Sequence, residues 1–284
     1  MSLDPRVTLA RTDLAAAGLE GEVSASRFAP TFATQVIAPA AAIRSAPDPS
    51  AEQLDQLLMG EVFDKLEEKD GFVWGQARRD GYVGFVEACT LADEINTPTH
   101  WVSVPRTFAF AEPSIKARAF GPISLNALVT IIEETETLAL ASDAGWIAKA
   151  HLSHIGEISA DPAAVAETFL GAPYLWGGRT SLGLDCSGLV QQSLYAAGLA
   201  CPRDADQQAL LGTPIDLNGL MRGDLVCWRG HIGMMLDETR LIHANAHHMA
   251  VALEPLAEAI TRIAAKRGGE PTAMRRPGRY LANT

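Results

Sequence analysis

Short apolar runs separated by polar turns make up most of the chain between residues 34 and 157. Residues 56–66 and 71–77 are two such runs, with the charged residues 67–70 between them, and residues 80–86 are a third. Runs of this kind between turn residues predict strands, and short strands at regular intervals predict a small barrel. We therefore expect an all-β domain over residues 34–96.

A weaker copy of the same pattern follows at residues 97–157. It ends on residues 143–149, which repeat the turn and strand chemistry of residues 80–86. The sequence thus predicts a second small barrel. Residues 1–33 show no clean alternation, and we predict an N-terminal segment that wraps the domains, with a short helix from Asp13 to Ala17.

After residue 158 the pattern becomes helical and then returns to strands. Asp161 and Pro162 suit the N-cap and first position of one helix, and residues 258–265 predict a last one. Between them, residues 189–197 have helical periodicity and end at Gly198. Helices that precede an antiparallel sheet make residues 158–284 an α+β domain. Its strands are predicted at residues 224–228, 231–236, 241–244 and 249–253.

Cys186 lies at the predicted start of the central helix. Unpaired backbone N–H groups and the positive end of the helix dipole favour a thiolate there, so we expect its pKa to lie below about 8.5. His231 and His243 lie on adjacent strands of a predicted hairpin. One can act as general base toward the cysteine while the other orients it. The two share a face only if the loop has an odd number of residues or a bulge, and the sequence leaves this register open.

Composition restricts the partners and the compartment. The 284 residues carry a net charge of −11, with 48% hydrophobic and 20% charged residues. An acidic chain is a poor match for nucleic acid or an anionic membrane, and no apolar run is long enough to span a bilayer. The N-terminus has no secretory signal pattern, and the four cysteines show neither a disulfide framework nor paired metal spacing. We expect a cytoplasmic monomer without metal or other cofactor.

Six motifs in the C-terminal half agree in order and spacing with one known family. They are residues 171–178, 184–188, 202–203, 223–225, 231–233 and 242–244. With them, the C-terminal half resembles the NlpC-type cell-wall cysteine peptidases, a bacterial branch of the papain-like superfamily. The Gly-Glu, Asp-Gly-Phe and Asp-Gly-Tyr-Val-Gly-Phe pattern of residues 60–85 is similar to bacterial SH3-like domains. The resemblance implies a papain-like α+β catalytic domain behind two SH3-like β-barrels.

The resemblance also implies site residues and a substrate. The family's nucleophile, base and third polar residue fall on Cys186, His231 and His243. The implied reaction is hydrolysis of the γ-D-glutamyl bond to a diamino acid, either meso-diaminopimelate or L-Lys. The implied substrates are murein-derived peptides with a free N-terminal L-Ala, met during recycling of the cell wall.

Four further residues are implied as substrate contacts. Asp185 and Ser187 flank the nucleophile and would hold the substrate's N-terminal residue, while Glu61 and Tyr82 would bind its free amine. Simpler interpretations are a helix cap for Asp185, a solvated charge for Glu61 and a strand aromatic for Tyr82. Ala205 departs from the family, because relatives often carry a pocket serine at this position.

Three other functions compete with peptide hydrolysis. The same cysteine–histidine arrangement can serve an amidase or acyltransferase acting on another small substrate. The SH3-like domains could bind wall peptides beside an inactive catalytic half, although Cys186, His231 and His243 are all present. A zinc site built from these three residues and His247 is the third, but its ligands lack compact metal-binding spacing.

Overall fold

The computed structural model describes residues 3–266 and 268–278 and divides the chain into two compact units. The first unit extends to Ile155 and the second begins at Gly156. The expected start of the catalytic domain, residue 158, lies just inside the second unit.

The first barrel is a seven-stranded antiparallel sheet in the order β5-β4-β8-β7-β6-β3-β9. The predicted single strand over residues 56–66 is wrong, because Gly60 adopts a φ of 80° and divides it. A 3₁₀ helix over Ala88–Thr90 precedes the last strand. The strands are β3 (Phe32–Val36), β4 (Ala40–Arg44), β5 (Gln53–Leu58), β6 (Val62–Lys69), β7 (Phe72–Ala77), β8 (Val83–Glu87) and β9 (Leu91–Ala92).

The second barrel consists of a three-stranded and a five-stranded sheet, in the orders β13-β10-β17 and β12-β11-β16-β15-β14. Leu58 and Met59 of the first barrel belong to its buried core. A 3₁₀ helix over Lys149–His151 precedes its last strand. The strands are β10 (His100–Val102), β11 (Arg106–Phe110), β12 (Ala119–Ser124), β13 (Leu128–Val129), β14 (Ile131–Glu134), β15 (Leu138–Ala141), β16 (Gly145–Ala148) and β17 (Leu152–His154).

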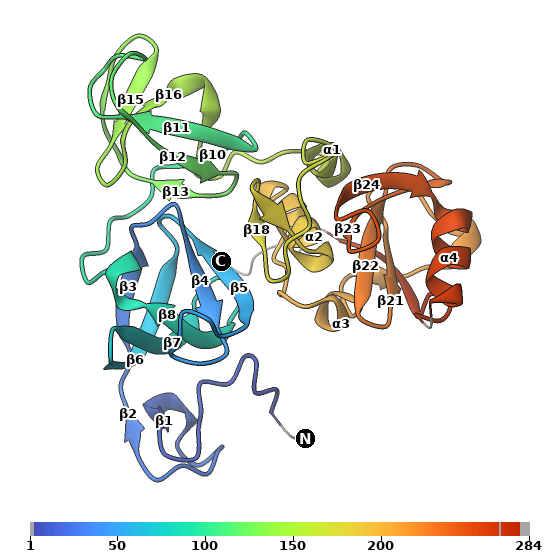
Figure 1. Cartoon of the computed structure of the whole chain (residues 1–284), viewed down its shortest axis with the longest axis horizontal. Helices are drawn as coiled ribbons and strands as arrows, with labels where there is room; N and C mark the ends of the chain where they lie inside the picture. Colours follow the sequence, from blue (N-terminus) through green and yellow to red (C-terminus); the bar gives the residue numbers. More distant parts are fainter. Residues whose placement is uncertain (1–2, 267, 279–284) are drawn as a thin grey trace. The chain divides into compact units, whose positions relative to one another are not determined.

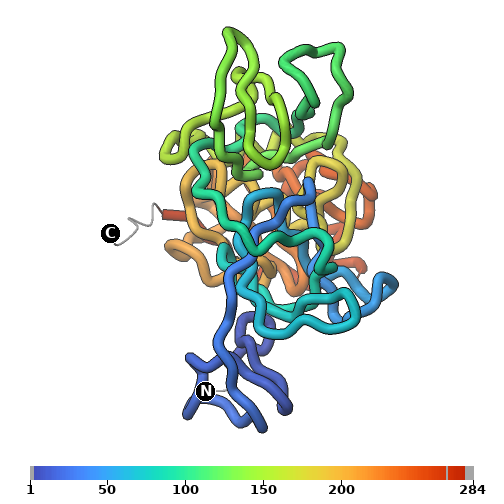
Figure 2. Tube along the Cα trace, turned by 90° about the vertical axis from the view of Figure 1, so that its left-hand side faces the viewer, coloured from blue at the N-terminus to red at the C-terminus, as the bar shows by residue number. Residues whose placement is uncertain are grey.

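The N-terminal segment forms its own set of turns beside the first barrel (Figure 2). The predicted helix from Asp13 is wrong. Instead β1 (Ala15–Ala16) pairs in parallel with β2 (Phe28–Ala29), and a 3₁₀ helix over Ala17–Leu19 follows β1. Leu9 and Leu14 of this segment are buried against Leu66 and Trp74 of the first barrel, which explains why so few regular elements suffice to hold it.

The second unit has a six-stranded antiparallel sheet in the order β20-β25-β21-β22-β23-β24, which lies between α2 and α4 (Figure 1). Its helices are α1 (Pro162–Glu167), α2 (Cys186–Ala196), α3 (Ala205–Gln208) and α4 (Leu256–Ala265), with a 3₁₀ helix over Leu217–Gly219. The strands are β18 (Arg179–Thr180), β19 (Gly183–Leu184), β20 (Thr213–Pro214), β21 (Leu225–Trp228), β22 (His231–Met235), β23 (Arg240–Asn245), β24 (Ala250–Pro255) and β25 (Ala273–Arg276).

The helix predictions for this unit agree with the structure apart from one boundary. Asp161 caps α1 by accepting the N–H of Ala163, and Gly198 follows α2 with a φ of 73°. The last helix begins directly after Pro255, earlier than the predicted residue 258. No helix in the described part of the chain is both long and apolar enough to cross a membrane.

Candidate active site

Cys186 is the first residue of α2, and a close contact between two glycines fixes this helix start. Asp185 is the N-cap and accepts the N–H of Gly188 at 2.7 Å. A Cβ atom on Gly188 would lie 2.1 Å from the carbonyl oxygen of Gly178, so only glycine allows the glycine-rich loop to approach the helix this closely. The capping interpretation of Asp185 is therefore confirmed.

Asp185 is also the centre of a buried ion pair. Arg203 donates to both oxygens of its carboxylate, at 2.6 and 3.0 Å, and to Ser187 Oγ at 2.8 Å. Gly177 N–H donates to the same carboxylate at 2.8 Å. The side chains of Arg203 and Asp185 are 1% and 8% exposed. The structure thus gives Asp185 and Ser187 a positioning role at the nucleophile, while their contact with substrate stays a prediction.

Burial dominates the chemistry of the Cys186 thiol. Burial raises its pKa to about 12, and the carboxylate of Asp185 acts in the same direction. Hydrogen bonds from the backbone N–H groups of Ile232 and Ser187 and the charge of Arg203 oppose the rise but do not outweigh it. The expected lowering of this pKa is therefore wrong, because the thiol at the helix terminus is buried away from water.

His231 and His243 face each other across the β22–β23 hairpin. Met235 pairs with Leu241, so five residues, 236–240, lie between the paired positions. This odd number puts both histidines on one face of the sheet and answers the question of register that the sequence left open. His231 Nε2 lies 2.8 Å from His243 Nδ1.

Both rings are neutral near pH 7. Burial lowers the pKa of His231 to about 3, with a further lowering from His243, and burial lowers the pKa of His243 to about 4. The backbone N–H of Ile232, the residue after His231 in β22, donates a hydrogen bond to the Cys186 sulfur. The resting site is thus a neutral thiol and a neutral imidazole.

The sequence analysis missed Glu254. His243 Nε2 lies 2.7 Å from Glu254 Oε1, and Arg262 of α4 forms an ion pair with the same oxygen. Its one signal in the sequence is a carboxylate at the end of the apolar strand that follows His243. Period-two alternation does not say which face such a residue takes until the pairing of β24 with β23 is known.

Tyr174 is a second residue without a predicted role. Burial, Cys186 and Asp185 raise the pKa of its phenol to about 12, so the phenol keeps its proton at neutral pH. A protonated phenol close enough to feel both groups is a hydrogen-bond donor beside the nucleophile. Ala205, where a pocket serine was expected, is the first residue of α3 and is partly buried.

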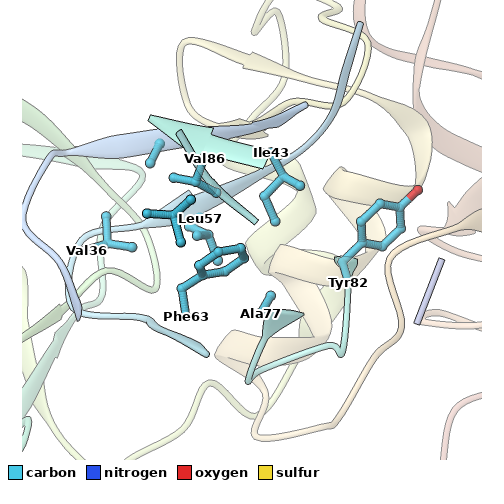
Figure 3. Packing of buried hydrophobic residues seen from close by; sticks show 9 residues of the cluster. Val36, Ile43, Leu57, Phe63, Ala77, Tyr82 and Val86 are labelled. Atoms are coloured by element: carbon cyan, nitrogen blue, oxygen red, sulfur yellow. The ribbon is translucent and has the colours of Figure 1, made fainter. Parts of the chain in front are cut away.

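Glu61 and Tyr82 lie in the N-terminal unit. The Glu61 side chain is 1% exposed, accepts the N–H of Leu58 at 3.1 Å and pairs with Arg79 at 2.9 Å, so its interpretation as a solvated charge is wrong. Tyr82 belongs to the buried core of the first barrel, with its hydroxyl pointing away from the cluster (Figure 3). Their role in binding a substrate amine stays a prediction.

The four residues of the zinc alternative are not the group of possible metal ligands that the structure brings together. Within residues 3–266 and 268–278, one group of three such side chains is close enough to share an ion: His243, His248 and Glu254, whose ligand atoms lie within 4.8 Å of one another. Arg262 already pairs with Glu254, and His248 Nδ1 lies 3.0 Å from Asn245 Oδ1. Hydrogen bonds and an ion pair therefore account for these groups without a metal.

Gly233→Ala is expected to displace His243. A Cβ at Gly233 would lie 3.1 Å from the Cβ of His243 and 2.9 Å from Leu241 Cδ1. Such overpacking costs about 1–3 kcal/mol, and a misplaced catalytic group can cost about 10²-fold in rate. We expect slower alkylation of Cys186 by iodoacetamide, measured by mass spectrometry of its peptide. Gly219→Ala is the control, because nothing lies within 4 Å of its added Cβ. Equal alkylation rates in both variants would contradict the prediction.

Comparison with known proteins agrees with this architecture. Residues 171–264 match the model of the NlpC/P60 family, and residues 43–91 match that of the bacterial dipeptidyl-peptidase SH3 domain. The solved structure of an NlpC/P60 family protein from Bacillus cereus superposes with a TM-score of 0.74 at 22% identity, covering 86% of this chain and 99% of that one. The predicted resemblance and the predicted fold class are confirmed.

Two relatives match most of the chain. The gamma-D-glutamyl-L-lysine dipeptidyl-peptidase of Bacillus cereus is 25% identical over 233 residues, which cover 71% of this chain and 70% of the relative. Dipeptidyl-peptidase 6 of Lysinibacillus sphaericus is 28% identical over 239 residues, covering 74% and 86%. These relatives support a peptidase of the NlpC/P60 type.

Proposed function

We propose that this chain, which carries an NlpC/P60 domain behind a bacterial dipeptidyl-peptidase SH3 domain, is a cysteine peptidase that cleaves γ-D-glutamyl–diamino acid bonds. The observation that carries the proposal is the hydrogen-bonded pair of His231 and His243 on β22 and β23. The Cys186 thiol accepts a hydrogen bond from the backbone N–H of Ile232, the residue that follows His231. A thiol, an imidazole and a group that orients the imidazole are the parts needed for acyl transfer through a thioester.

The reaction would proceed in two steps. The Cys186 proton passes to His231 as the sulfur attacks the carbonyl carbon, and the imidazolium then gives this proton to the departing amine. Water, deprotonated by His231, attacks the thioester and releases the acid and the thiol. Both steps pass through an oxyanion, which backbone N–H groups at the start of α2 and the protonated Tyr174 phenol would stabilise.

The substrate is inferred from the relatives and from the predicted contacts. Two relatives are named gamma-D-glutamyl-L-lysine dipeptidyl-peptidase and dipeptidyl-peptidase 6. A dipeptidyl-peptidase releases a dipeptide from the N-terminus of its substrate, so we expect this chain to recognise a free N-terminus. We assign this recognition to Asp185, Ser187, Glu61 and Tyr82. We propose that the protein is a monomer, that it acts in the cytoplasm, and that it takes part in the recycling of murein peptides.

Mass spectrometry of two matched peptides tests this function. L-Ala-γ-D-Glu-L-Lys is expected to be cleaved to the dipeptide and lysine, whereas its N-acetylated copy is expected to be spared, because acetylation removes the ammonium. The same pair with meso-diaminopimelate in place of lysine reports the preferred diamino acid. Tyr82→Phe removes only the hydroxyl and is expected to raise KM for the free peptide.

The outcomes separate chemistry from recognition. Equal cleavage of the free and acetylated peptides would reject the amine-binding roles of Glu61 and Tyr82 but keep the peptidase. No cleavage of either peptide by fully reduced protein would reject the peptidase, and amide or acyl-transfer substrates would be tried next.

A further inference from the structure

We infer that Glu254 is a positioning residue that sets which nitrogen of each active-site histidine carries the proton. The inference rests on the proposed cysteine peptidase. Its geometry is a continuous chain of hydrogen bonds from β22 to α4, in which His231 contacts His243 at 2.8 Å, His243 contacts Glu254 at 2.7 Å, and Arg262 pairs with Glu254.

The register of the sheet brings these groups to one face. His243 pairs with Ala252 and Leu241 pairs with Glu254, so Glu254 lies diagonally next to His243 on β24. The histidine side chain is 0% exposed and the carboxylate 11% exposed. Arg262 reaches the carboxylate from α4, which begins directly after β24. Its charge offsets the cost of holding a carboxylate out of water.

An ionised Glu254 carboxylate determines which atom donates in each hydrogen bond of this series. Burial opposes the ionisation of Glu254, but the hydrogen bond from Arg262 and the neighbouring His243 outweigh it and lower its pKa. A carboxylate only accepts hydrogen bonds, so His243 Nε2 must carry a hydrogen. Since the ring is neutral, Nδ1 of His243 has none and accepts from Nε2–H of His231. Nδ1 of His231 is then left with the lone pair that a general base needs.

The Glu254 carboxylate also reduces the cost of the charged state that the reaction creates. When His231 takes the proton of Cys186, it becomes an imidazolium hydrogen-bonded to His243. Burial, His243 and Arg262 lower the pKa of His231, and the charge of Glu254 raises it, so the carboxylate offsets part of the cost of this cation. Glu254 acts through His243 and touches no reacting atom, and for this reason its effect is expected on kcat rather than on KM.

Glu254→Gln tests the inference with minimal change of shape. The amide can donate as well as accept, so it permits the opposite tautomers, in which His231 presents N–H instead of a lone pair to the thiol. We expect kcat for L-Ala-γ-D-Glu-L-Lys to fall about 10- to 100-fold, no more than the low end of what general acid–base catalysis contributes because His231 itself remains, with KM within about twofold. Glu167→Gln is the matched control, because Glu167 also pairs with an arginine, Arg222, at 2.5 Å but away from the histidines.

Two measurements keep the test independent of peptide cleavage. ¹⁵N NMR of the imidazole nitrogens is expected to show His243 protonated at Nε2 and His231 protonated at Nε2 in the unaltered protein. In Glu254→Gln, signals of the opposite tautomers are expected to appear. Alkylation of Cys186 by iodoacetamide is expected to slow in parallel. These readouts stand even if the peptide is not a substrate, so failure of the inference and failure of the proposed function are distinguishable.

The opposite results would overturn the assignment. Unchanged tautomers and an unchanged alkylation rate in Glu254→Gln, with the same melting temperature as Glu167→Gln, would show that Glu254 only pairs with Arg262. If Glu254→Gln lost activity only in proportion to the loss of folded protein, and its folded fraction kept the same histidine tautomers, Glu254 would likewise have only a structural role.

Discussion

Cys186→Ala is expected to abolish peptide cleavage, with kcat lowered by about 10⁶-fold, the loss seen when the nucleophile of a comparable catalytic triad is removed. The proposed thioester cannot form without the sulfur, and no other group at the start of α2 can replace it. Folding is expected to persist, because alanine suits the first turn of a helix and Asp185 still caps it. Hydrolysis of the free tripeptide and the melting temperature are the measurements.

Cys227→Ala is the matched control for this substitution. Cys227 is also buried in the catalytic unit, with its pKa raised to about 12 by burial, but it lies in β21. Its replacement is expected to cost about 1 kcal/mol of stability for the lost buried volume and to leave kcat unchanged. Cleavage that survives in Cys186→Ala would reject the thioester, whereas cleavage by the unaltered protein that disappears with a chelator would favour the zinc alternative.

Local sequence signals predicted the nucleophile helix well. An N-cap aspartate, a helical period and a terminal glycine are all short-range features, and α2 begins at Cys186 as expected. The pKa of the Cys186 thiol could not be predicted from such local features. The helix dipole is a local property, but desolvation depends on how the rest of the unit covers the sulfur, and it reversed the expected direction of the pKa shift.

Register was the main limit on predicting the rest of the site. Glu254 meets His243 only because β24 pairs with β23 in one of several possible alignments, and a shift by one residue would put it on the opposite face. The break at Gly60 shows the same limit in the first barrel. One glycine within an apolar run is compatible with a continuous strand or a turn. Only the turn buries Glu61 against Leu58 and Arg79.

Arg203→Met is expected to destabilise the catalytic unit by about 3–5 kcal/mol. The arginine is the charged partner of Asp185, and both lie out of water, so its loss leaves an uncompensated buried carboxylate. Thermal unfolding of the unaltered protein and the variant is the measurement. At about 2–4 °C per kcal/mol for a protein of this size, the melting temperature should fall by roughly 10 °C.

The control for this change uses an arginine with similar partners but in water. Arg222 pairs with Asp161 and Glu167, its side chain is 37% exposed, and Arg222→Met is expected to cost no more than about 1 kcal/mol.

Arg203 also lowers the pKa of Cys186, so folded Arg203→Met should be alkylated by iodoacetamide more slowly than the control. Adding Asp185→Asn removes the unpaired charge and should recover part of the stability. If Arg203→Met had the same melting temperature as Arg222→Met, the buried ion pair would not be what holds the nucleophile helix against the glycine-rich loop.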